Sequence, residues 1–401
     1  MPARRGNALS ARRNDRMIDA DAALLAQIDR MCADAYYRRL VLGFCDGIDA
    51  TEAARFNGTI HPGDQMLLHS LREYRDAGAA FAQYFNVASQ QHAAARQVMR
   101  AAFGDETEIE VLDFACGYGR LLRFLSLSIG PSRIWASDIQ ADATAFVGSA
   151  FGVHTLPSHA DPARFEPGRR FDFIWVASLF SHLPEALFHA WLARLIASLT
   201  PRGVLCFSVR DAALLPGRDA LPDSGLAYAA ESENAGLATE IYGTAYASER
   251  FVRGALHAAT RDDQPYVRLP RALANEQDLY VVAADPRRDL APLRAFRRGA
   301  WGWVDVRSLS GDGSLSLQGW AASLDDGSVD EVEIEVDGVR YACRTSVERP
   351  DVAAAFGDDR LARSGWSFRC DLDVRSARVA VSARTARGEG ALLYAGAIRR
   401  G

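Results

Sequence analysis

The sequence contains no lysine, and all 46 of its basic residues are arginine. This absence excludes every mechanism that needs a lysine amine, such as a Schiff base or the lysine of a phosphate-binding P-loop. Together with the abundance of alanine, it indicates a GC-rich bacterial genome. The net charge of −5 provides no basic field that would attract nucleic acid, so we expect no nucleic-acid partner.

Long apolar runs and ordered cysteine spacings are missing as well. No run reaches the roughly 18 apolar residues of a membrane span, and no apolar segment follows the basic start of the chain as it would in a signal peptide. The six cysteines are scattered, without a C-x-x-C pair, so we expect no bound metal. These absences favour a cytoplasmic protein with reduced thiols.

The length of 401 residues favours more than one domain. Residues 1–15 are charged and poor in large apolar groups, and we expect them to be disordered. Apolar residues at three- and four-residue steps predict a cap of helices over 16–104. Between 105 and 285, short apolar runs alternate with amphipathic stretches, which predicts a parallel sheet with helices on both faces. Residues 211–248 interrupt this alternation, and we expect this insertion to cover the substrate.

The pattern changes towards the C-terminus. Residues 286–300 are basic and are typical of a linker. Over 301–401 the apolar period is two, and Asp-Gly and Ser-Gly turn signals separate the short runs. This pattern predicts an all-β sandwich. Because the two periodicities differ, we expect the sandwich to have a core of its own.

The strongest chemical signal is the stretch VLDFACGYGR at 111–120. It predicts a strand, then a loop in which Gly117 and Gly119 let the backbone approach a ligand closely. A helix starting near Arg120 would point its N-terminal amides at that ligand. The same glycines would also serve a plain tight turn between a strand and a helix, so the motif needs further support.

That support comes from the end of the next strand, IWASDI. An acidic residue at the position of Asp138 accepts hydrogen bonds from the ribose hydroxyls of a nucleoside. Ile139 follows it, where an apolar side chain can pack on an adenine ring. The alternative for Asp138 is a cap for the helix that follows.

A nicotinamide dinucleotide uses the same arrangement of strand, loop, helix and acid. Its fingerprint, G-x-G-x-x-G, needs a third glycine for close packing of the helix. Here the sequence reads A-C-G-Y-G-R-L-L-R, with bulky residues after the second glycine. A nucleoside without a pyrophosphate fits this loop better, and a nicotinamide-dependent oxidoreductase remains the alternative.

Four stretches in order, VLDFACGYGR, SDI, FDFIWVASLFSHLP and LTPRGVLCFS, resemble successive motifs of the class I S-adenosylmethionine (SAM)-dependent methyltransferases. The resemblance covers about residues 105–285. It implies a Rossmann-like, mostly parallel sheet of seven strands, in which the last strand, DLYVVAA, is antiparallel. It also implies SAM as the cofactor and methyl transfer to an oxygen or nitrogen atom. A non-catalytic SAM-binding protein with this fold is a second alternative.

The resemblance implies roles for individual residues. The methionyl and ribose parts of the cofactor would contact the loop residues Asp113, Ala115, Cys116, Gly117 and Gly119. The ribose and adenine would contact Asp138, Ile139, Ser158 and His159, and Ala177 would border the methyl group. Ala115 stands where the family most often has glycine, and we expect this to have a small effect on the methionyl pocket.

Methyl transfer from a sulfonium needs an aligned acceptor and, for an oxygen acceptor, a base that removes a proton. His182 follows the fourth strand and is the first candidate base, which we expect at the rim of the pocket. The alternative is a histidine that caps or packs at the start of a helix. Asp211, after the fifth strand, is the second candidate, and its alternative is a turn residue.

The acceptor is less defined by the sequence. The stretches GWAASLDDG, ERPDVAAAF and SGWSFRCDLDV resemble a β-sandwich appended to some bacterial glycosyltransferases and methyltransferases. The 211–248 insertion adds aromatic rings and carboxylates, among them Tyr228, Glu231 and Tyr242. Together these features favour a small molecule or glycan as the acceptor, in particular a sugar or a sugar-containing metabolite.

Overall fold

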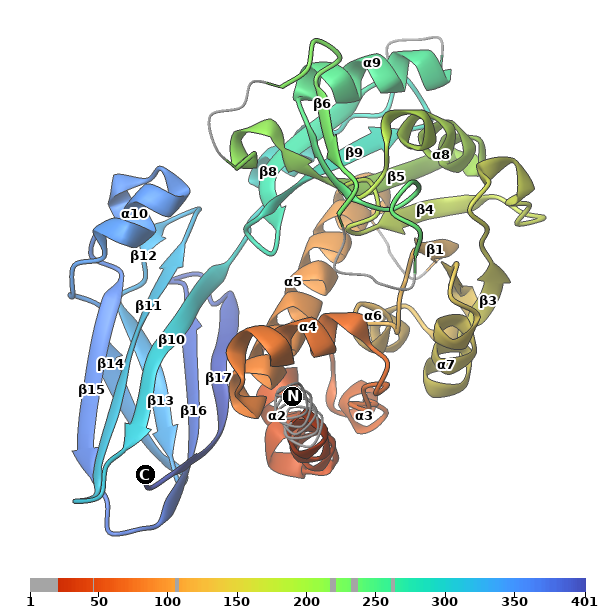
Figure 1. Ribbon diagram of the computed structural model, residues 1–401. Coiled ribbons are helices and arrows are strands. Elements are labelled where there is room, and N and C mark those ends of the chain that lie inside the picture. The colour runs from red at the N-terminus through yellow and green to blue at the C-terminus, as the bar shows by residue number, and fades with distance from the viewer. Residues whose placement is uncertain (1–20, 46, 105–107, 217–220, 232–236, 261–263) are drawn as a thin grey trace, which may run out of the picture. The chain divides into compact units, whose positions relative to one another are not determined.

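The computed structural model describes residues 21–45, 47–104, 108–216, 221–231, 237–260 and 264–401 (Figure 1). The expected disorder of residues 1–15 lies outside these ranges. The chain divides into two compact units. The first consists of Met1–Phe44, Gly58–Asn86 and Gly299–Gly401, and the second of Cys45–Asn57 and Val87–Arg298.

The second unit contains the alternating strands and helices that the sequence predicts. In chain order they are α3 (Ala50–Ala54), the greater part of α5 (Ala77–Phe103), β1 (Val111–Phe114), α6 (Leu122–Ser128), β2 (Ile134–Asp138), α7 (Ala141–Phe151), β3 (His154–Pro157), β4 (Phe171–Val176), α8 (Glu185–Ala197) and β5 (Leu199–Asp211). After them come β6 (Leu226–Ala229), β7 (Thr244–Ala247), α9 (Glu249–Thr260), β8 (Tyr266–Leu273) and β9 (Gln277–Ala283). Every residue of β1 and β4 is buried, as expected for central strands covered on both faces.

These strands form one sheet in the order β3-β2-β1-β4-β5-β9-β8. The pairings from β3 to β5 are parallel, whereas β9 runs antiparallel to both β5 and β8. The Rossmann-like sheet and its antiparallel strand DLYVVAA are therefore confirmed. The insertion extends the sheet beyond the expected seven strands, because β7 pairs with the end of β5 and β6 pairs with β7.

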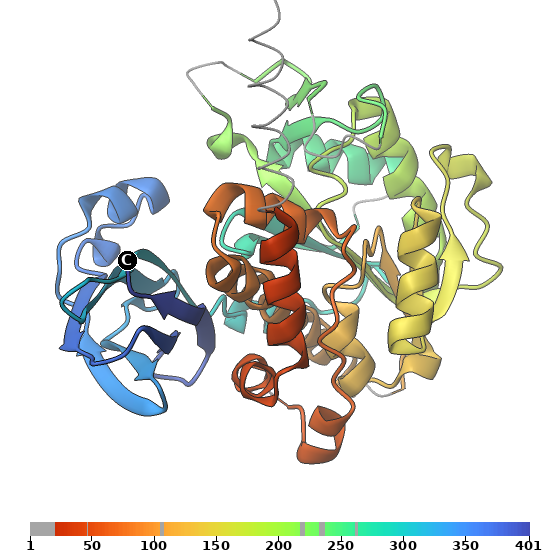
Figure 2. The ribbon, with the colours of Figure 1, turned by 60° about the horizontal axis from the view of Figure 1, so that its bottom comes forward.

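Helices cover both faces of this sheet (Figure 2). Alternate strand residues such as Val111 and Trp175 face a core that includes residues of α5, α6 and α7. Their neighbours Leu112 and Ile174 face the opposite core, which includes residues of α8 and α9. Because the side chains of a strand alternate between faces, the central strands fill both cores and need apolar residues throughout.

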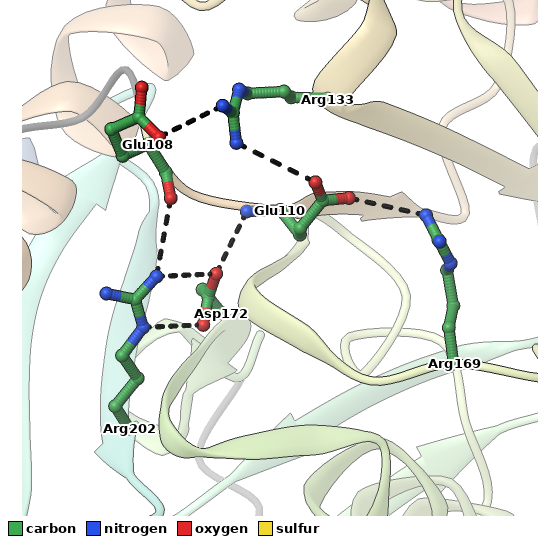
Figure 3. Close-up of polar contacts among 6 residues, drawn as sticks. All are labelled: Glu108, Glu110, Arg133, Arg169, Asp172 and Arg202. Atoms are coloured by element: carbon green, nitrogen blue, oxygen red, sulfur yellow. Dashed lines mark hydrogen bonds and ion pairs between the residues drawn. The ribbon is translucent and has the colours of Figure 1, made fainter.

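The amino ends of the parallel strands are joined by ion pairs (Figure 3). Arg202 donates to both oxygens of Asp172, at 2.9 and 3.0 Å, and the N–H of Glu110 donates to the same carboxylate at 3.1 Å. Arg133 bridges Glu108 and Glu110, and Arg169 also pairs with Glu110. Ion pairs therefore occupy the amino edge of the sheet. We expect a ligand at the opposite, carboxyl edge, where open parallel sheets bind their ligands.

The first unit combines helices with the C-terminal strands. Residues 21–33 are helical, followed by α2 (Ala35–Leu42), α4 (Gln65–Tyr74) and the beginning of α5. Asp34 and Asp64 cap the second and third of these helices, because each side chain accepts a hydrogen bond from a backbone N–H in the first turn. None of the described helices combines the length and the apolarity that a membrane crossing requires.

The C-terminal strands of this unit form two sheets. One contains β10 (Ala300–Leu309), β11 (Ser314–Ser323), β12 (Gly327–Ser328) and β15 (Gly365–Asp371), and the other contains β14 (Val339–Arg344), β13 (Glu331–Val336), β16 (Ser376–Arg384) and β17 (Gly390–Arg399). All their pairings are antiparallel, and one short helix, α10 (Pro350–Phe356), precedes β15. The expected all-β sandwich is confirmed.

The core of the sandwich is not made by its strands alone. Ala79 of α5 is buried in the same cluster as Leu317, Ile334 and Val381, and Tyr74 of α4 packs against it. A Cβ on Gly78 would lie 2.7 Å from the carbonyl oxygen of the β17 residue Ala395, so the helix backbone touches the strand directly. The expectation that the sandwich has a core of its own was wrong. The apolar period of two in its strands does not reveal that helix residues pack against them.

Candidate functional site

The loop that follows β1 has an unusual backbone. Ala115 (φ 58°), Gly117 (φ 51°) and Gly119 (φ 76°) all lie in the left-handed region. Glycine adopts this conformation freely, whereas an alanine there costs roughly 1–2 kcal/mol because its Cβ approaches the backbone. Strain of this kind is concentrated at functional sites. The strained Ala115 comes directly after the carboxyl end of a central strand, where ligands bind in such sheets.

The two glycines of this loop differ in what surrounds them. A Cβ on Gly119 would lie 2.5 Å from Phe151 and 2.9 Å from Val147, both on α7, so packing explains this glycine. A Cβ on Gly117 would have no described atom within 4 Å. The space beside Gly117 is therefore open to a ligand, whereas Gly119 is needed for close contact with the helix.

Asp138 at the end of β2 holds this loop in place. Its Oδ2 accepts a hydrogen bond from the N–H of Gly117 at 2.9 Å, and its Oδ1 accepts one from the N–H of Gln140 at 2.9 Å. The residue is 8% exposed; burial raises the pKa of its carboxyl group, and these backbone N–H groups oppose the rise. The carboxylate thus lies beside the open space at Gly117 and also holds the N–H of Gln140, the residue immediately before α7.

Asp113 in β1 is more deeply buried, with 3% of its surface exposed. Burial, followed by the negative charge of Asp138, raises the pKa of Asp113 to about 8. Among the described residues, no donor forms a hydrogen bond with its carboxyl group. A buried carboxyl group without a partner is costly unless a ligand satisfies it, and a cationic ligand group would stabilise its charged form.

The residues after β2 and β3 border the same edge. Ile139 is 39% exposed, which is unusual for a large apolar side chain and leaves it available to a flat ring. The N–H of Ser158 donates to the carbonyl of Asp138 at 3.2 Å, so the two strand ends meet. In His159, Nδ1 accepts a hydrogen bond from the N–H of Asp161 at 3.0 Å, and Nε2 contacts Arg164. Both ring nitrogens are thus engaged locally.

Cys116 and Ala177 offer no reactive group. Burial, followed by the charges of Asp113 and Asp138, raises the pKa of the Cys116 thiol, so it stays protonated and does not act as a nucleophile. Ala177 is partly buried directly after β4. In the part of the chain that the structure describes, no group of three His, Cys, Asp or Glu side chains is placed to hold a metal ion.

His182 lies between β4 and α8 with only 2% of its surface exposed. Because a carbonyl only accepts, Nδ1 of the ring donates to the carbonyl of Gly243, at 2.6 Å. The ring stacks on Tyr242, with centroids 4.4 Å apart and planes inclined by 9°. The histidine therefore ties the insertion to the end of β4, and its ring is buried where the sequence suggested an open rim.

Asp211 ends β5 and is fully engaged in the structure. Its Oδ1 accepts from the N–H of Ala213 at 2.9 Å, and its Oδ2 pairs with Arg268 at 2.7 Å. The same arginine pairs with Asp278 at 2.6 Å and with Glu249 at 3.0 Å. An aspartate held by an arginine and a turn N–H is a weak candidate for a base, and the turn role is the one that the geometry supports.

A ring of hydrogen bonds at the carboxyl edge was not foreseen. The N–H of Ser178 donates to Oγ of Ser208 at 2.8 Å, which donates to Oε1 of Gln277 at 2.7 Å, and Nε2 of Gln277 donates to Oγ of Ser178 at 3.0 Å. Ser178 has a positive φ of 59°, like Ala115 after β1. The ring joins β4, β5 and β9, and the sequence gives no sign of it because Ser178 and Gln277 are far apart in the chain.

Together these features fit a nucleoside that carries a cationic amino group. The buried carboxyl group of Asp113 has no hydrogen-bond partner in the described part of the chain, Asp138 lies beside the open space at Gly117, and Ile139 presents an apolar surface. No part of the loop provides the third glycine that a dinucleotide needs.

Comparison with protein families identifies this part of the chain. Residues 87–255 match the model of a family described as a methyltransferase domain. The matched range contains the loop after β1, Asp138 and the carboxyl ends of β4 and β5. The chain carries a methyltransferase domain. The match supports methyl transfer and gives no support to the nicotinamide-dependent oxidoreductase.

Solved structures of other methyltransferases are similar to this methyltransferase at low identity. The sugar N-methyltransferase KedS8 from Streptoalloteichus is 16% identical with a TM-score of 0.38, over 50% of this chain and 88% of that one. The 1,6-didemethyltoxoflavin-N1-methyltransferase from Burkholderia thailandensis is 20% identical with a TM-score of 0.37, over 54% of this chain and 85% of that one. No curated protein sequence matches the chain.

Proposed function

We propose that this methyltransferase transfers the methyl group of SAM to an oxygen or nitrogen atom of a polar small molecule, with a sugar or a sugar-containing metabolite as the favoured acceptor. The observation that carries the proposal is the carboxyl edge itself. There, the open space beside Gly117 adjoins Asp138, and Asp113 has no partner among the described residues.

The cofactor would be held by this edge of the sheet. Asp113 would meet the amino group of the methionyl part, because a cation stabilises a buried carboxylate. Asp138 would accept hydrogen bonds from the ribose hydroxyls, and Ile139 would pack on the adenine. The remaining contacts would come from the backbone of Ala115, Cys116, Gly117 and Gly119 and from Ser158, His159 and Ala177.

The sulfonium of SAM supplies an activated methyl group, so the protein has to position the acceptor and manage its proton. For an oxygen acceptor we propose His182 as the base. Donation from Nδ1 to the carbonyl of Gly243 fixes the neutral ring in the tautomer whose Nε2 carries the lone pair. Asp211 is the second candidate, although its carboxylate is already engaged by Arg268 and by the N–H of Ala213.

A polar acceptor is supported by the side chains that the structure brings to this edge. Ser178, Gln277 and the stacked pair His182–Tyr242 are all hydrogen-bonding or aromatic groups. Tyr228 of the insertion instead donates to the carbonyl of Thr239 at 2.6 Å, so it serves the fold of the insertion. The resemblance of the C-terminal strands to a β-sandwich appended to some bacterial glycosyltransferases and methyltransferases favours a sugar among polar acceptors.

The proposal is tested with SAM carrying a labelled methyl group and a panel of amino sugars, neutral monosaccharides and their nucleotide-linked forms. We expect label to enter at least one of these compounds at a rate that is proportional to the amount of protein. Transfer only to polypeptides or nucleic acids would contradict the proposed acceptor class, while it would leave the use of SAM intact.

A further inference from the structure

The turn of the hairpin between β8 and β9 contains one apolar residue, Ala274, and one polar residue, Asn275, both with positive φ. Ala274 and Asn275 have φ values of 54° and 56°, and the N–H of Glu276 donates to the carbonyl of Leu273 at 3.1 Å. Two residues with positive φ inside such a hydrogen bond form a tight hairpin turn, and three residues in all separate β8 from β9. Asparagine tolerates this conformation, and so does glycine, at lower cost.

The side chain of Asn275 does not behave like that of an ordinary turn residue. Turn asparagines lie at the surface, but Asn275 is only 2% exposed. Among the described residues, neither Nδ2 nor Oδ1 of its amide has a hydrogen-bond partner. A buried amide with all of its hydrogen-bonding capacity unused destabilises a fold, so its presence calls for a reason outside the fold.

The conformation of the turn does not supply that reason. Ala274 has nearly the same φ as Asn275, yet its side chain has no polar atom. A glycine at position 275 would suit the same backbone and would remove the buried amide altogether. The amide of Asn275 therefore stabilises neither the turn nor the buried interior. A residue that breaks local rules of stability in this way is expected at a binding site.

The turn lies at the edge of the sheet where the cofactor residues lie. Because β9 is antiparallel to β5, with Asp278 paired to Val209, the start of β9 lies at the carboxyl end of β5. Gln277, two residues after Asn275, closes the hydrogen-bond ring with Ser178 and Ser208. Asn275 thus belongs to the edge at which parallel sheets bind their ligands.

We propose that Asn275 binds the methyl acceptor and selects one that presents a neutral donor and acceptor together, such as adjacent hydroxyl groups or a carboxamide. This inference rests on the proposed function, whose acceptor it specifies. An amide pairs best with such groups, because it has two N–H donors and one oxygen acceptor in one plane. An acceptor without these groups leaves the amide unpaired and is discriminated against.

The test compares Asn275→Gly with the matched variant Ala274→Gly. Both substitutions place glycine at a left-handed position of one turn, but only the first removes the amide. In urea unfolding, we expect Asn275→Gly to raise the midpoint relative to wild type at least as much as Ala274→Gly does. Both variants should bind SAM within twofold of wild type.

Methyl transfer separates the two variants. With the neutral monosaccharides of the panel as probes, Asn275→Gly should raise KM for the probe at least tenfold, while Ala274→Gly should leave it unchanged. A lower urea midpoint for Asn275→Gly than for Ala274→Gly would overturn the inference, because the amide would then be serving the fold. So would an unchanged KM in Asn275→Gly. If the wild-type protein methylates no probe, the proposed acceptor class fails on its own, whatever the midpoints show.

Discussion

The N–H of Gly117 donates to the carboxylate of Asp138 at 2.9 Å, and this bond ties the loop after one strand to the end of the next. The same aspartate therefore fixes the shape of the loop and places a carboxylate beside the open space at Gly117. In the proposed complex with SAM, loop shape and ribose binding would therefore be coupled, and substitution of Asp138 is expected to weaken cofactor binding.

Ala115→Gly should stabilise the protein. The alanine has a φ of 58°, and glycine removes a strain of roughly 1–2 kcal/mol, of which the greater entropy of the unfolded chain takes back part. We expect the free energy of unfolding to rise by about 0.5–1 kcal/mol, measured in urea. Ala145→Gly in the exposed face of α7 is the control and should lower it by about 1 kcal/mol. A loss of stability in Ala115→Gly would mean that this φ is not strained in solution.

Binding of SAM should release a proton from Asp113. Its carboxyl group, with a pKa of about 8, is mostly protonated at pH 7, and the cationic amino group of SAM would lower that pKa. Calorimetric binding enthalpies at pH 7 should therefore differ between phosphate and Tris buffers, and the difference should vanish in Asp113→Asn. Equal enthalpies for the wild-type protein in the two buffers would show that SAM leaves Asp113 protonated.

Asp172 should make the fold sensitive to acid. Burial alone would raise the pKa of Asp172, but the hydrogen bonds from Arg202, the N–H of Glu110 and Thr200 hold it below its usual value. A lowered pKa contributes stability above the unfolded value, near 3.9, and this stability is lost as the pH falls through the folded value.

The variant Asp172→Asn should accordingly lose about 1–3 kcal/mol of unfolding free energy at pH 7, the scale of hydrogen bonds to a charged group. The difference from wild type should shrink as the pH falls below about 4. Arg133→Gln, which breaks solvent-accessible ion pairs with Glu108 and Glu110, is the control and should change the free energy by less than about 1 kcal/mol. A constant difference between Asp172→Asn and wild type from pH 7 to pH 3 would contradict this assignment.

His182→Asn tests the proposed base. The amide of asparagine can still donate to the carbonyl of Gly243, so SAM affinity should stay within about 0.5 kcal/mol of wild type. Turnover of a hydroxyl acceptor should fall by roughly 10²–10⁴, and the acidic limb of the pH–rate profile should disappear. Turnover at the wild-type rate would leave His182 as a residue that anchors the insertion, and Asp211→Asn would then be the next variant to measure.

The sequence predicted the parts of the site that lie close together in the chain. Asp113, Gly117 and Asp138 come from one strand–loop–helix–strand unit, in which local spacing decides what faces the ligand. Ser178 and Gln277 meet only because β9 inserts next to β5, and no local pattern shows such a pairing. Asn275 gave one faint signal, an asparagine between two apolar runs, which indicates a turn but not a buried amide.

The same reasoning explains what the sequence left open in the fold. Both the Rossmann-like sheet and the sandwich follow from apolar periods that are visible in short windows. The contact of Gly78 with Ala395 joins positions more than three hundred residues apart, so the shared core of α4, α5 and the sandwich could not be read from either segment. Strands β6 and β7 were missed because they are short and half-exposed.

The most direct test is a calorimetric titration of SAM into the wild-type protein and into Asp138→Ala. We expect saturable binding at one site in the wild type, weakened by about 1.5–3 kcal/mol in the variant, which loses charge-assisted hydrogen bonds from a buried group. Asp371→Ala, at an exposed position of β15, is the control and should bind SAM as the wild type does. Undiminished affinity in a folded Asp138→Ala protein would contradict the placement of the cofactor at this edge of the sheet.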